Sequence, residues 1–228
     1  MRQMLCRALL LLAAAATPVA AQQAYMPSMG GGDYILPITS MKQARTRTTL
    51  IQKYDFSCGS AALATLLTHH YGMPVSEETV FQEMYRTGNQ AKIHKEGFSL
   101  LDMKRFLEAR GFEADGFQLP LDKLNEARVP AIVLINESGY HHFVVVKGVM
   151  ADRVLLGDPA RGTRIMSRRD FEARWQNSLL FVIHNQMERA RFNVAAEWRV
   201  VPRAPLGEGI SRGSMSDFTM PKMGPGDF

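Results

Sequence analysis

Cysteine and long hydrophobic runs are scarce in this sequence. Only 2 of its 228 residues are cysteine, Cys6 and Cys58, which is too few for a disulfide-stapled fold or a cysteine-rich zinc module. The apolar run at residues 8–16 is well short of the ~20 residues that a membrane-spanning helix needs. The chain instead has 46% hydrophobic and 21% charged residues, which is the composition of a globular domain.

The formal charge is +5, and the 27 basic residues are spread along the whole chain. A basic stripe or cluster is typical of nucleic-acid binding, whereas scattered charge serves solubility. We therefore expect no nucleic-acid partner. The length suits one or two domains with a well-filled core.

The first 21 residues have the pattern of a secretory signal peptide. Arg2 and Arg7 flank the start, the short apolar run follows, and small residues lead up to Ala21. A basic N-terminal region, a short apolar stretch and small residues before the cleavage site are typical of such a signal. The alternative is an uncleaved anchor, which the shortness of the run disfavours. The sequence thus predicts a periplasmic or secreted protein, with no stable membrane insertion once residues 1–21 are cleaved.

The rest of the chain divides into three stretches. Residues 22–45 include Gly30–Gly32 and show little apolar periodicity, so we expect a flexible N-terminal segment there. Residues 46–201 carry the helix and strand patterns of one domain. Residues 202–228 contain five glycines and four prolines, which favours a disordered tail rich in Gly, Pro and Met.

The order of the periodic segments predicts an α+β fold. Helices come first, and they open near Cys58, Ser76 and Ser99. Apolar runs rich in β-branched residues come later, and the turns between them are short enough for antiparallel pairing. This order does not fit an alternating parallel sheet. Strands are expected over residues 129–135, 143–149, 154–156, 164–166 and 179–183, and further helices over about 121–127 and 168–175.

Cys58 is the single cysteine left after cleavage of the signal peptide. A lone thiol in an oxidising compartment is either buried and inert or kept for its reactivity. Cys58 lies where a loop becomes a helix, and the positive end of the helix dipole favours thiolate over thiol there. Gly59 allows another chain to come close. The amide of Gln52, six residues upstream, could stabilise an oxyanion together with the backbone N–H of Cys58.

A thiolate nucleophile needs a base and a group that orients the base. His141 and His142 open an apolar strand, and alternation places them on opposite faces, so at most one of them can address Cys58. Asp158 ends the next strand, and an antiparallel hairpin would bring its carboxylate beside a histidine of the first strand. Taken singly, an Asp-Pro turn and a packed strand histidine are ordinary structural features. The spacing leaves open which histidine is used.

Three motifs together resemble a known family. Gln52-x5-Cys58-Gly59, His142-Phe143-Val144-Val145 and Asp158-Pro159-x-x-Gly162 have the order and spacing of the double-glycine, or bacteriocin-processing, cysteine peptidases. The similarity spans about residues 48–185. It implies a papain-like fold, with N-terminal helices packed on an antiparallel sheet. It further implies Cys58 as nucleophile, His142 rather than His141 as general base and acid, Asp158 as the group that orients the imidazole, and Gln52 as oxyanion donor.

The resemblance implies an exported cysteine peptidase from the stand-alone branch of this family. Exporter-linked members often have Asp before the nucleophile, where this chain has Ser57. The expected substrate is a peptide or protein, with cleavage after Gly-Gly in a secreted client as one option. A component of a secretion system is a candidate partner, and no cofactor is expected. Two alternatives are a transamidase or acyltransferase that uses the same triad, and a catalytically silent peptide- or leader-binding accessory domain of an export system.

Two other polar groups have structural explanations. His69 and His70 fall at the C-terminal end of a helix, where the dipole favours imidazolium. No zinc-ligand spacing surrounds them, so no metal site is expected. Four arginines near the expected cleft are interpreted as a solvated edge that could meet an acidic substrate; they are Arg161, Arg164, Arg168 and Arg169.

Overall fold

The computed structural model describes residues 23–27, 33–37 and 39–200. The expected signal peptide and the expected tail from residue 202 onward lie outside these ranges. None of the helices in the described part of the chain is long and apolar enough to cross a bilayer.

The stretch before the main domain contains regular elements. β1 (Gln23–Pro27) and β2 (Asp33–Pro37) pair as an antiparallel two-stranded sheet within one unit of the structure. α1 (Met41–Thr46) opens the second unit, which includes all the elements that follow. The flexibility expected for residues 22–45 stays a prediction.

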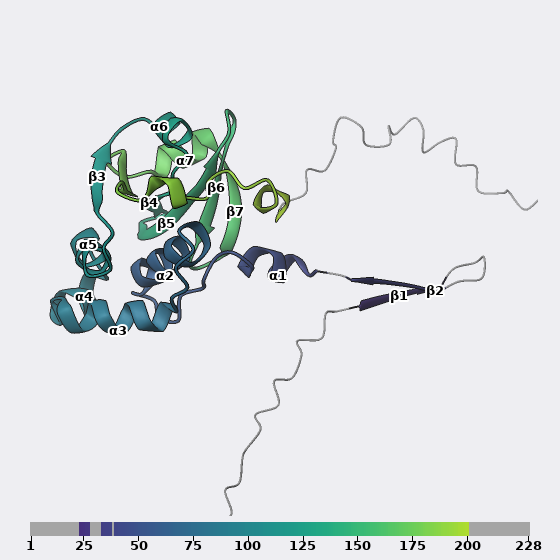
Figure 1. Ribbon diagram of the computed structural model, residues 1–228, viewed down its shortest axis with the longest axis horizontal. Coiled ribbons are helices and arrows are strands. Elements are labelled where there is room, and N and C mark those ends of the chain that lie inside the picture. Colours follow the sequence, from purple (N-terminus) through teal and green to yellow (C-terminus); the bar gives the residue numbers. More distant parts are fainter. Residues whose placement is uncertain (1–22, 28–32, 38, 201–228) are drawn as a thin grey trace, which may run out of the picture. The chain divides into compact units, whose positions relative to one another are not determined.

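The main domain is built around a six-stranded antiparallel sheet (Figure 1). The strand order is β3-β8-β4-β5-β6-β7, so β4 to β7 follow one another as hairpins. Each of the five expected strands is present. The bounds are β3 (Ala114–Gln118), β4 (Ala131–Glu137), β5 (Tyr140–Val149), β6 (Arg153–Asp158), β7 (Gly162–Ser167) and β8 (Leu179–Ile183).

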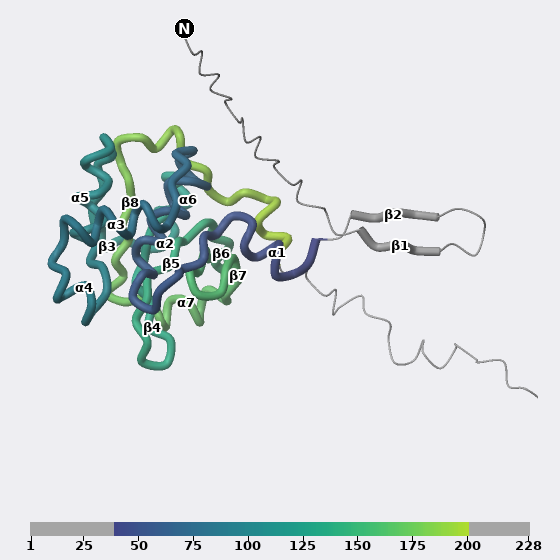
Figure 2. The backbone as a smooth tube through the Cα atoms, turned by 90° about the horizontal axis from the view of Figure 1, so that it is seen from below, coloured from purple at the N-terminus to yellow at the C-terminus, as the bar shows by residue number. Residues whose placement is uncertain are grey.

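Helices pack on both faces of this sheet, and Figures 1 and 2 show α2 against β5. The first four helices of the main domain contribute to one core, and the last two to the other. Their bounds are α2 (Cys58–Thr65), α3 (Glu77–Thr87), α4 (Gln90–Glu96) and α5 (Leu100–Glu108) for the first core, and α6 (Asp122–Ala127) and α7 (Arg168–Arg174) for the second. The α+β fold expected from the sequence is confirmed.

Strand β5 is buried on both faces, which explains its continuous apolar run. Phe143 and Val145 point into the core that α2 shares. Val144 and Val146 point into the core that contains Phe171 of α7. Because each face of the strand meets a helical layer, neither face needs polar residues. The site described below lies at the start of this central strand.

Serine N-caps begin three of the helices, as the sequence indicates. The side chains of Ser76, Ser99 and Ser167 each accept a hydrogen bond from the backbone N–H three residues later. Ser99 also forms the expected capping box with Asp102. These caps satisfy N–H groups that have no partner within the helix.

The sequence analysis missed an edge strand and a short helix. β3 has the sequence Ala-Asp-Gly-Phe-Gln, which contains no β-branched residue, and it is a strand because it pairs with β8. α4 has only seven residues, which is too short for a clear helical period. The chain also continues from α2 into a π-helical turn over Leu66–His70.

A tight turn between β4 and β5 sets the register of the site. Ser138 and Gly139 both have positive φ, 55° and 90°, which is typical of a type I′ hairpin turn. The turn pairs Glu137 with Tyr140 across the two strands. Tyr140 and His142 are two residues apart on β5 and therefore share one side of the strand.

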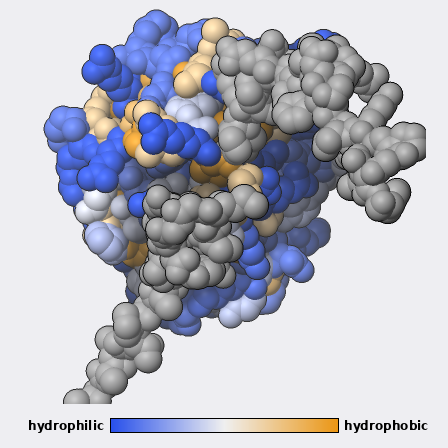
Figure 3. Space-filling model, turned by 90° about the vertical axis from the view of Figure 1, so that its right-hand side faces the viewer, coloured by the Kyte–Doolittle hydropathy of each residue, from blue (hydrophilic) through white to orange (hydrophobic). Residues whose placement is uncertain are grey.

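The apolar side chains are concentrated in the two cores. The face seen in Figure 3 is mostly hydrophilic, with smaller apolar areas between the polar side chains. A surface of this kind agrees with the scattered charge of the sequence.

Candidate active site

Helix α2 begins at Cys58, as the sequence predicts. The thiol is 8% exposed, and the rest of α2 is buried behind it. The preceding turn is closed by the Ser57 hydroxyl, which donates to the carbonyl of Tyr54 at 2.9 Å. Gly59 allows the close approach that the sequence indicates, because an added Cβ would lie 2.8 Å from Met103 Cε and 3.0 Å from Phe98 Cβ.

Burial decides the protonation of the nucleophile. It raises the pKa of the Cys58 thiol, while hydrogen bonding to the backbone of Phe143, Gly59 and Cys58 itself acts in the opposite direction without outweighing it. The backbone at the helix start thus acts in the expected direction and favours the thiolate, but burial outweighs it. The reason is that a helix terminus offers partial charges, whereas burial removes the hydration of a full negative charge.

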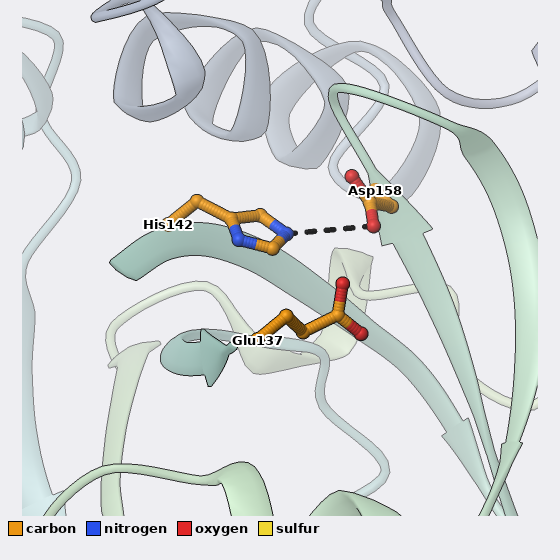
Figure 4. Close-up of side chains that lie close together, drawn as sticks. All are labelled: Glu137, His142 and Asp158. Carbon is orange, nitrogen blue, oxygen red and sulfur yellow. Dashed lines mark hydrogen bonds and ion pairs between the residues drawn. The ribbon is translucent and has the colours of Figure 1, made fainter. Parts of the chain in front are cut away.

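The thiol interacts with the backbone of Phe143, the residue that follows His142 on β5. The His142 side chain is buried, and its Nε2 lies 3.5 Å from Asp158 Oδ2 (Figure 4). Its Nδ1 is also buried and has no hydrogen-bond partner among the described residues. One ring nitrogen thus faces the acid, and the other is left unpaired.

His141 lies on the other side of the strand. It is exposed, and its Nε2 contacts the side-chain amide of Asn136 at 3.2 Å. The alternation expected for the two histidines is confirmed. The structure brings His142, and not His141, to Asp158.

Asp158 ends β6 and is completely buried. Its Oδ1 accepts a hydrogen bond from the Ala160 N–H at 2.9 Å, and its Oδ2 accepts one from Arg164 Nε at 2.8 Å. Burial acts to raise the pKa of this carboxyl, but the hydrogen bond with His142, the charge of Arg164 and the Ala160 N–H together lower it below its usual value. The group beside the imidazole is therefore a carboxylate.

Gln52 is tied to the loop that follows Asp158. Its backbone N–H donates to the carbonyl of Pro159 at 3.0 Å. Its side-chain Nε2 donates to the carbonyls of Tyr54 and Asp55 at 3.0 and 3.5 Å, and its Oε1 is buried without a partner among the described residues. The structure places Gln52 beside the nucleophile loop, and its role as oxyanion donor stays a prediction.

Tyr140 is a site residue that the sequence analysis missed. Its ring stacks on the ring of His142, with centroids 5.1 Å apart and planes 26° apart. Its hydroxyl donates to the carbonyl of Asp55 at 3.1 Å. Burial, followed by the charge of Cys58, raises the pKa of Tyr140. The signal available in the sequence was its position two residues before His142 on a strand.

Arg164 and Glu137 form a second missed part of the site. Arg164 Nη2 donates to Glu137 Oε1 at 2.8 Å, while its Nε bonds Asp158. The interpretation of Arg164 as part of a solvated edge is wrong, since its side chain is only 17% exposed. Arg168 is also paired rather than merely solvated, because it bonds both Asp122 and Glu172.

Two groups of histidines and carboxylates were considered for metal binding. One ligand atom from each of Glu137, His142 and Asp158 lies within 4.8 Å of the others. The guanidinium of Arg164 bonds both carboxylates of this group, so the protein already supplies a cation that offsets part of their charge. The second group is the adjacent pair His69 and His70, which no carboxylate joins in a ligand cluster within the described part of the chain.

His70 is a buried structural residue. Its Nδ1 lies 2.6 Å from the carbonyl of Arg191. Burial lowers its pKa to about 3, so the ring is neutral near pH 7. The expectation that this helix end favours imidazolium is wrong for His70, because the ring lies inside the protein rather than in water.

An apolar groove of about 390 Å³ adjoins the site. Phe143, the residue whose backbone contacts the thiol, forms part of its wall. Leu100, Leu101 and Leu134 line it as well, and Leu101 is among the exposed large apolar residues. A groove of this kind suits an apolar side chain of a bound peptide.

Comparisons with known proteins agree with this geometry. The model of the family described as "Peptidase C39 family" matches residues 47–187. A protein of Pseudomonas fluorescens described as "Probable functional amyloid protease FapD" is 40% identical over 183 residues, which is 80% of this chain and 79% of that protein. A protein of the same description from Pseudomonas aeruginosa is 37% identical over 177 residues, which is 78% of each chain.

One solved structure shows the same fold. It is the peptidase domain of Streptococcus ComA, which is described as a bi-functional ABC transporter involved in a quorum sensing pathway. The TM-score is 0.50 at 23% identity, over 60% of this chain and 97% of that domain. The papain-like architecture expected from the sequence is confirmed by this likeness.

Proposed function

Because this chain belongs to the peptidase C39 family, and is thus a cysteine peptidase, we propose that it cleaves peptide bonds through Cys58, His142 and Asp158. The observation that carries the proposal is the state of the His142 ring. Its Nε2 faces the Asp158 carboxylate, and its buried Nδ1 has no partner in the described part of the chain. A ring nitrogen without a partner can exchange a proton with the thiol of Cys58, which is the role proposed for it.

The first half of the reaction forms a thioester. His142 Nδ1 takes the proton of Cys58, and the sulfur attacks the carbonyl carbon of the scissile peptide bond. The resulting tetrahedral oxyanion is stabilised by the backbone N–H of Cys58 and the amide of Gln52. When the C–N bond breaks, the imidazolium returns the proton to the departing amine.

The second half hydrolyses the thioester. A water molecule gives a proton to His142 and attacks the acyl carbon. The C–S bond then breaks, and the imidazolium returns the proton to the leaving sulfur, which releases the acid and restores the thiol. Asp158 holds the ring in place and stabilises its cationic form in both halves. Because burial raises the pKa of Cys58, little thiolate exists before the substrate binds, and transfer to His142 is needed for attack.

We propose that the substrate is a secreted protein, cut after a Gly-Gly sequence. The groove beside Phe143 supports a peptide with apolar side chains near the scissile bond. The description of two relatives as probable functional amyloid proteases supports an amyloid-forming protein as the client. The signal-like residues 1–21 support export to the periplasm or beyond, with a component of a secretion system as partner.

The experiment is cleavage of a synthetic peptide that contains leucines followed by Gly-Gly, in water enriched in oxygen-18. The full chain should release two fragments, and the new carboxyl group should carry the heavy oxygen because water resolves the thioester. Cys58→Ala should release neither fragment while its melting temperature stays close to that of the parent chain. Cleavage that persists in Cys58→Ala would overturn the proposal, and an amide product instead of an acid would indicate acyl transfer.

A further inference from the structure

Arg164 lies directly behind the acid of the proposed triad. Its Nε donates to Asp158 Oδ2 at 2.8 Å, the same oxygen that lies 3.5 Å from His142 Nε2. It reaches this position from β7, which pairs with β6 so that Arg164 lies opposite Leu156. The side chain is 17% exposed, whereas that of Arg161, three residues earlier, is 60% exposed.

The other arm of the guanidinium bonds a second carboxylate. Arg164 Nη2 donates to Glu137 Oε1 at 2.8 Å. Glu137 and Asp158 come within 4.8 Å of each other, and both are shielded from water. Two carboxylates this close cannot both remain ionised in a shielded site without a cation between them. Arg164 is that cation, and its planar fork lets it bond both groups at once.

We propose that Arg164 is a positioning residue, which Glu137 holds in place, and that it keeps Asp158 ionised and turned toward His142. It does not contact the nucleophile or the scissile bond, and it acts through the acid. This inference rests on the proposed function, since Asp158 matters only if His142 takes up the proton of the thiol.

The other charged groups around Asp158 do not replace Arg164. Glu137 adds a like charge, and Cys58 and Tyr140 add further negative charge when they ionise. Arg161 Nη1 forms an ion pair with Glu137 Oε2 at 3.0 Å, whereas the ion pairs of Asp158 in the described part of the chain are with His142 and Arg164. Apart from His142 itself, Arg164 is the cation that bonds the acid in the described part of the chain.

The test is the rate at which iodoacetamide alkylates Cys58 in the full chain at pH 7, followed by mass spectrometry of the peptide that contains it. This readout needs no peptide substrate. Loss of the Asp158 charge makes proton transfer to His142 less favourable, and one unit of pKa is worth about tenfold in that equilibrium. Arg164→Gln should therefore slow alkylation by about tenfold, while the matched control Arg161→Gln should react like the parent chain.

A second comparison separates positioning from general damage. In a His142→Ala background, adding Arg164→Gln should change the alkylation rate by less than about twofold, because the path through the imidazole is already gone. Arg164→Lys keeps the positive charge and should restore most of the rate. It also keeps the inference testable if Arg164→Gln does not fold.

Four results would overturn the inference, and they can be told apart. If Cys58 of Arg164→Gln is alkylated as fast as in the parent chain, Arg164 does not act through the triad. The same holds if Arg164→Gln slows alkylation by the same factor in the His142→Ala background as in the parent chain. If folded Arg164→Lys is as slow as a folded Arg164→Gln, its charge is not the reason. If His142→Ala alkylates as fast as the parent chain, the proposed function itself fails, and this inference fails with it.

Discussion

The ring of Tyr140 lies on the ring of His142, and its hydroxyl reaches across to the carbonyl of Asp55 on the loop that leads to Cys58. The strand that carries the base is thereby tied to the loop that carries the nucleophile. The imidazole is held by stacking on one face and by Asp158 at its edge. Two contacts at different angles restrict a ring more than either contact alone.

We expect Tyr140→Ala to lower kcat about tenfold with a smaller change in KM, because the imidazole loses the ring that fixes its plane. Tyr140→Phe keeps the stacking and loses only the hydroxyl, so it should retain more than half of the parent kcat. Steady-state kinetics with the Gly-Gly peptide would measure both variants. Equal losses in the two variants would contradict the stacking role and assign the effect to the hydrogen bond with Asp55.

A second prediction concerns the space around Gly59. An added Cβ would be 3.0 Å from Phe98 Cβ, which cannot move away easily, and 2.8 Å from the flexible end of Met103. Gly59→Ala should therefore reduce the free energy of unfolding by about 1–3 kcal/mol, which is usual for overpacking. Urea unfolding followed by circular dichroism would measure the loss.

The matched background is Met103→Ala, which removes one of the two clashing groups. Gly59→Ala should cost less there than in the parent chain, because only Phe98 remains in the way. The same cost in both backgrounds would mean that Met103 contributes nothing, and that the loss comes from Phe98 or from the backbone of α2.

The sequence could predict the three residues of the proposed triad because each is marked by its neighbours along the chain. Cys58 precedes a small-residue helix start, His142 opens an apolar strand, and Asp158 precedes Pro159 at a turn. The hairpin expected between the two strands is present as the antiparallel pair β5 and β6. Local patterns marked these positions because the site lies at the ends of regular elements, but the choice of His142 over His141 came from the family resemblance.

The sequence could not predict Arg164 and Glu137 as partners, because their contact depends on the register of three strands. β4, β6 and β7 contribute one carboxylate, the other carboxylate and the arginine, respectively. A shift of one residue in any pairing would turn a side chain to the other face. The raised pKa of the Cys58 thiol could not be predicted either. The position of a residue in a helix can be inferred from a sequence, whereas the burial of its side chain cannot.

A third prediction follows from the neutral, buried His70. Its folded pKa of about 3 is below the value near 6.5 of an unfolded histidine, so the unfolded chain binds the extra proton first as the pH falls. Stability should therefore decrease between about pH 6.5 and 3, with a slope of up to ~1.4 kcal/mol per pH unit from this residue. Chemical unfolding at several pH values would show the slope.

The control for His70 separates this residue from the other titrating groups. His70→Asn removes the titration, so its stability curve should be flatter than that of the parent chain over this pH range, even though its stability at pH 7 is lower. Equal slopes for the parent and His70→Asn would contradict the prediction.

The last prediction concerns Lys147, which lies at a bulge of β5 and is fully buried. Its Nζ pairs with Glu197 at 2.6 Å and donates to the carbonyl and hydroxyl of Thr48 at 2.8 and 2.7 Å. The strand that carries His142 is thus joined to two segments that are distant in sequence. Lys147→Met should cost about 3–5 kcal/mol of stability, because it leaves the Glu197 carboxylate buried without a cation.

The double variant Lys147→Met/Glu197→Gln tests the reason for that cost. It removes both charges, so it should be more stable than Lys147→Met alone, although it contains one more substitution. Urea unfolding of the parent, both single variants and the double variant gives the coupling directly. Additive losses would mean that the ammonium is needed for its bonds to Thr48 and not for Glu197. In either case iodoacetamide should alkylate Cys58 in the folded double variant at the parent rate, because neither residue contacts the triad.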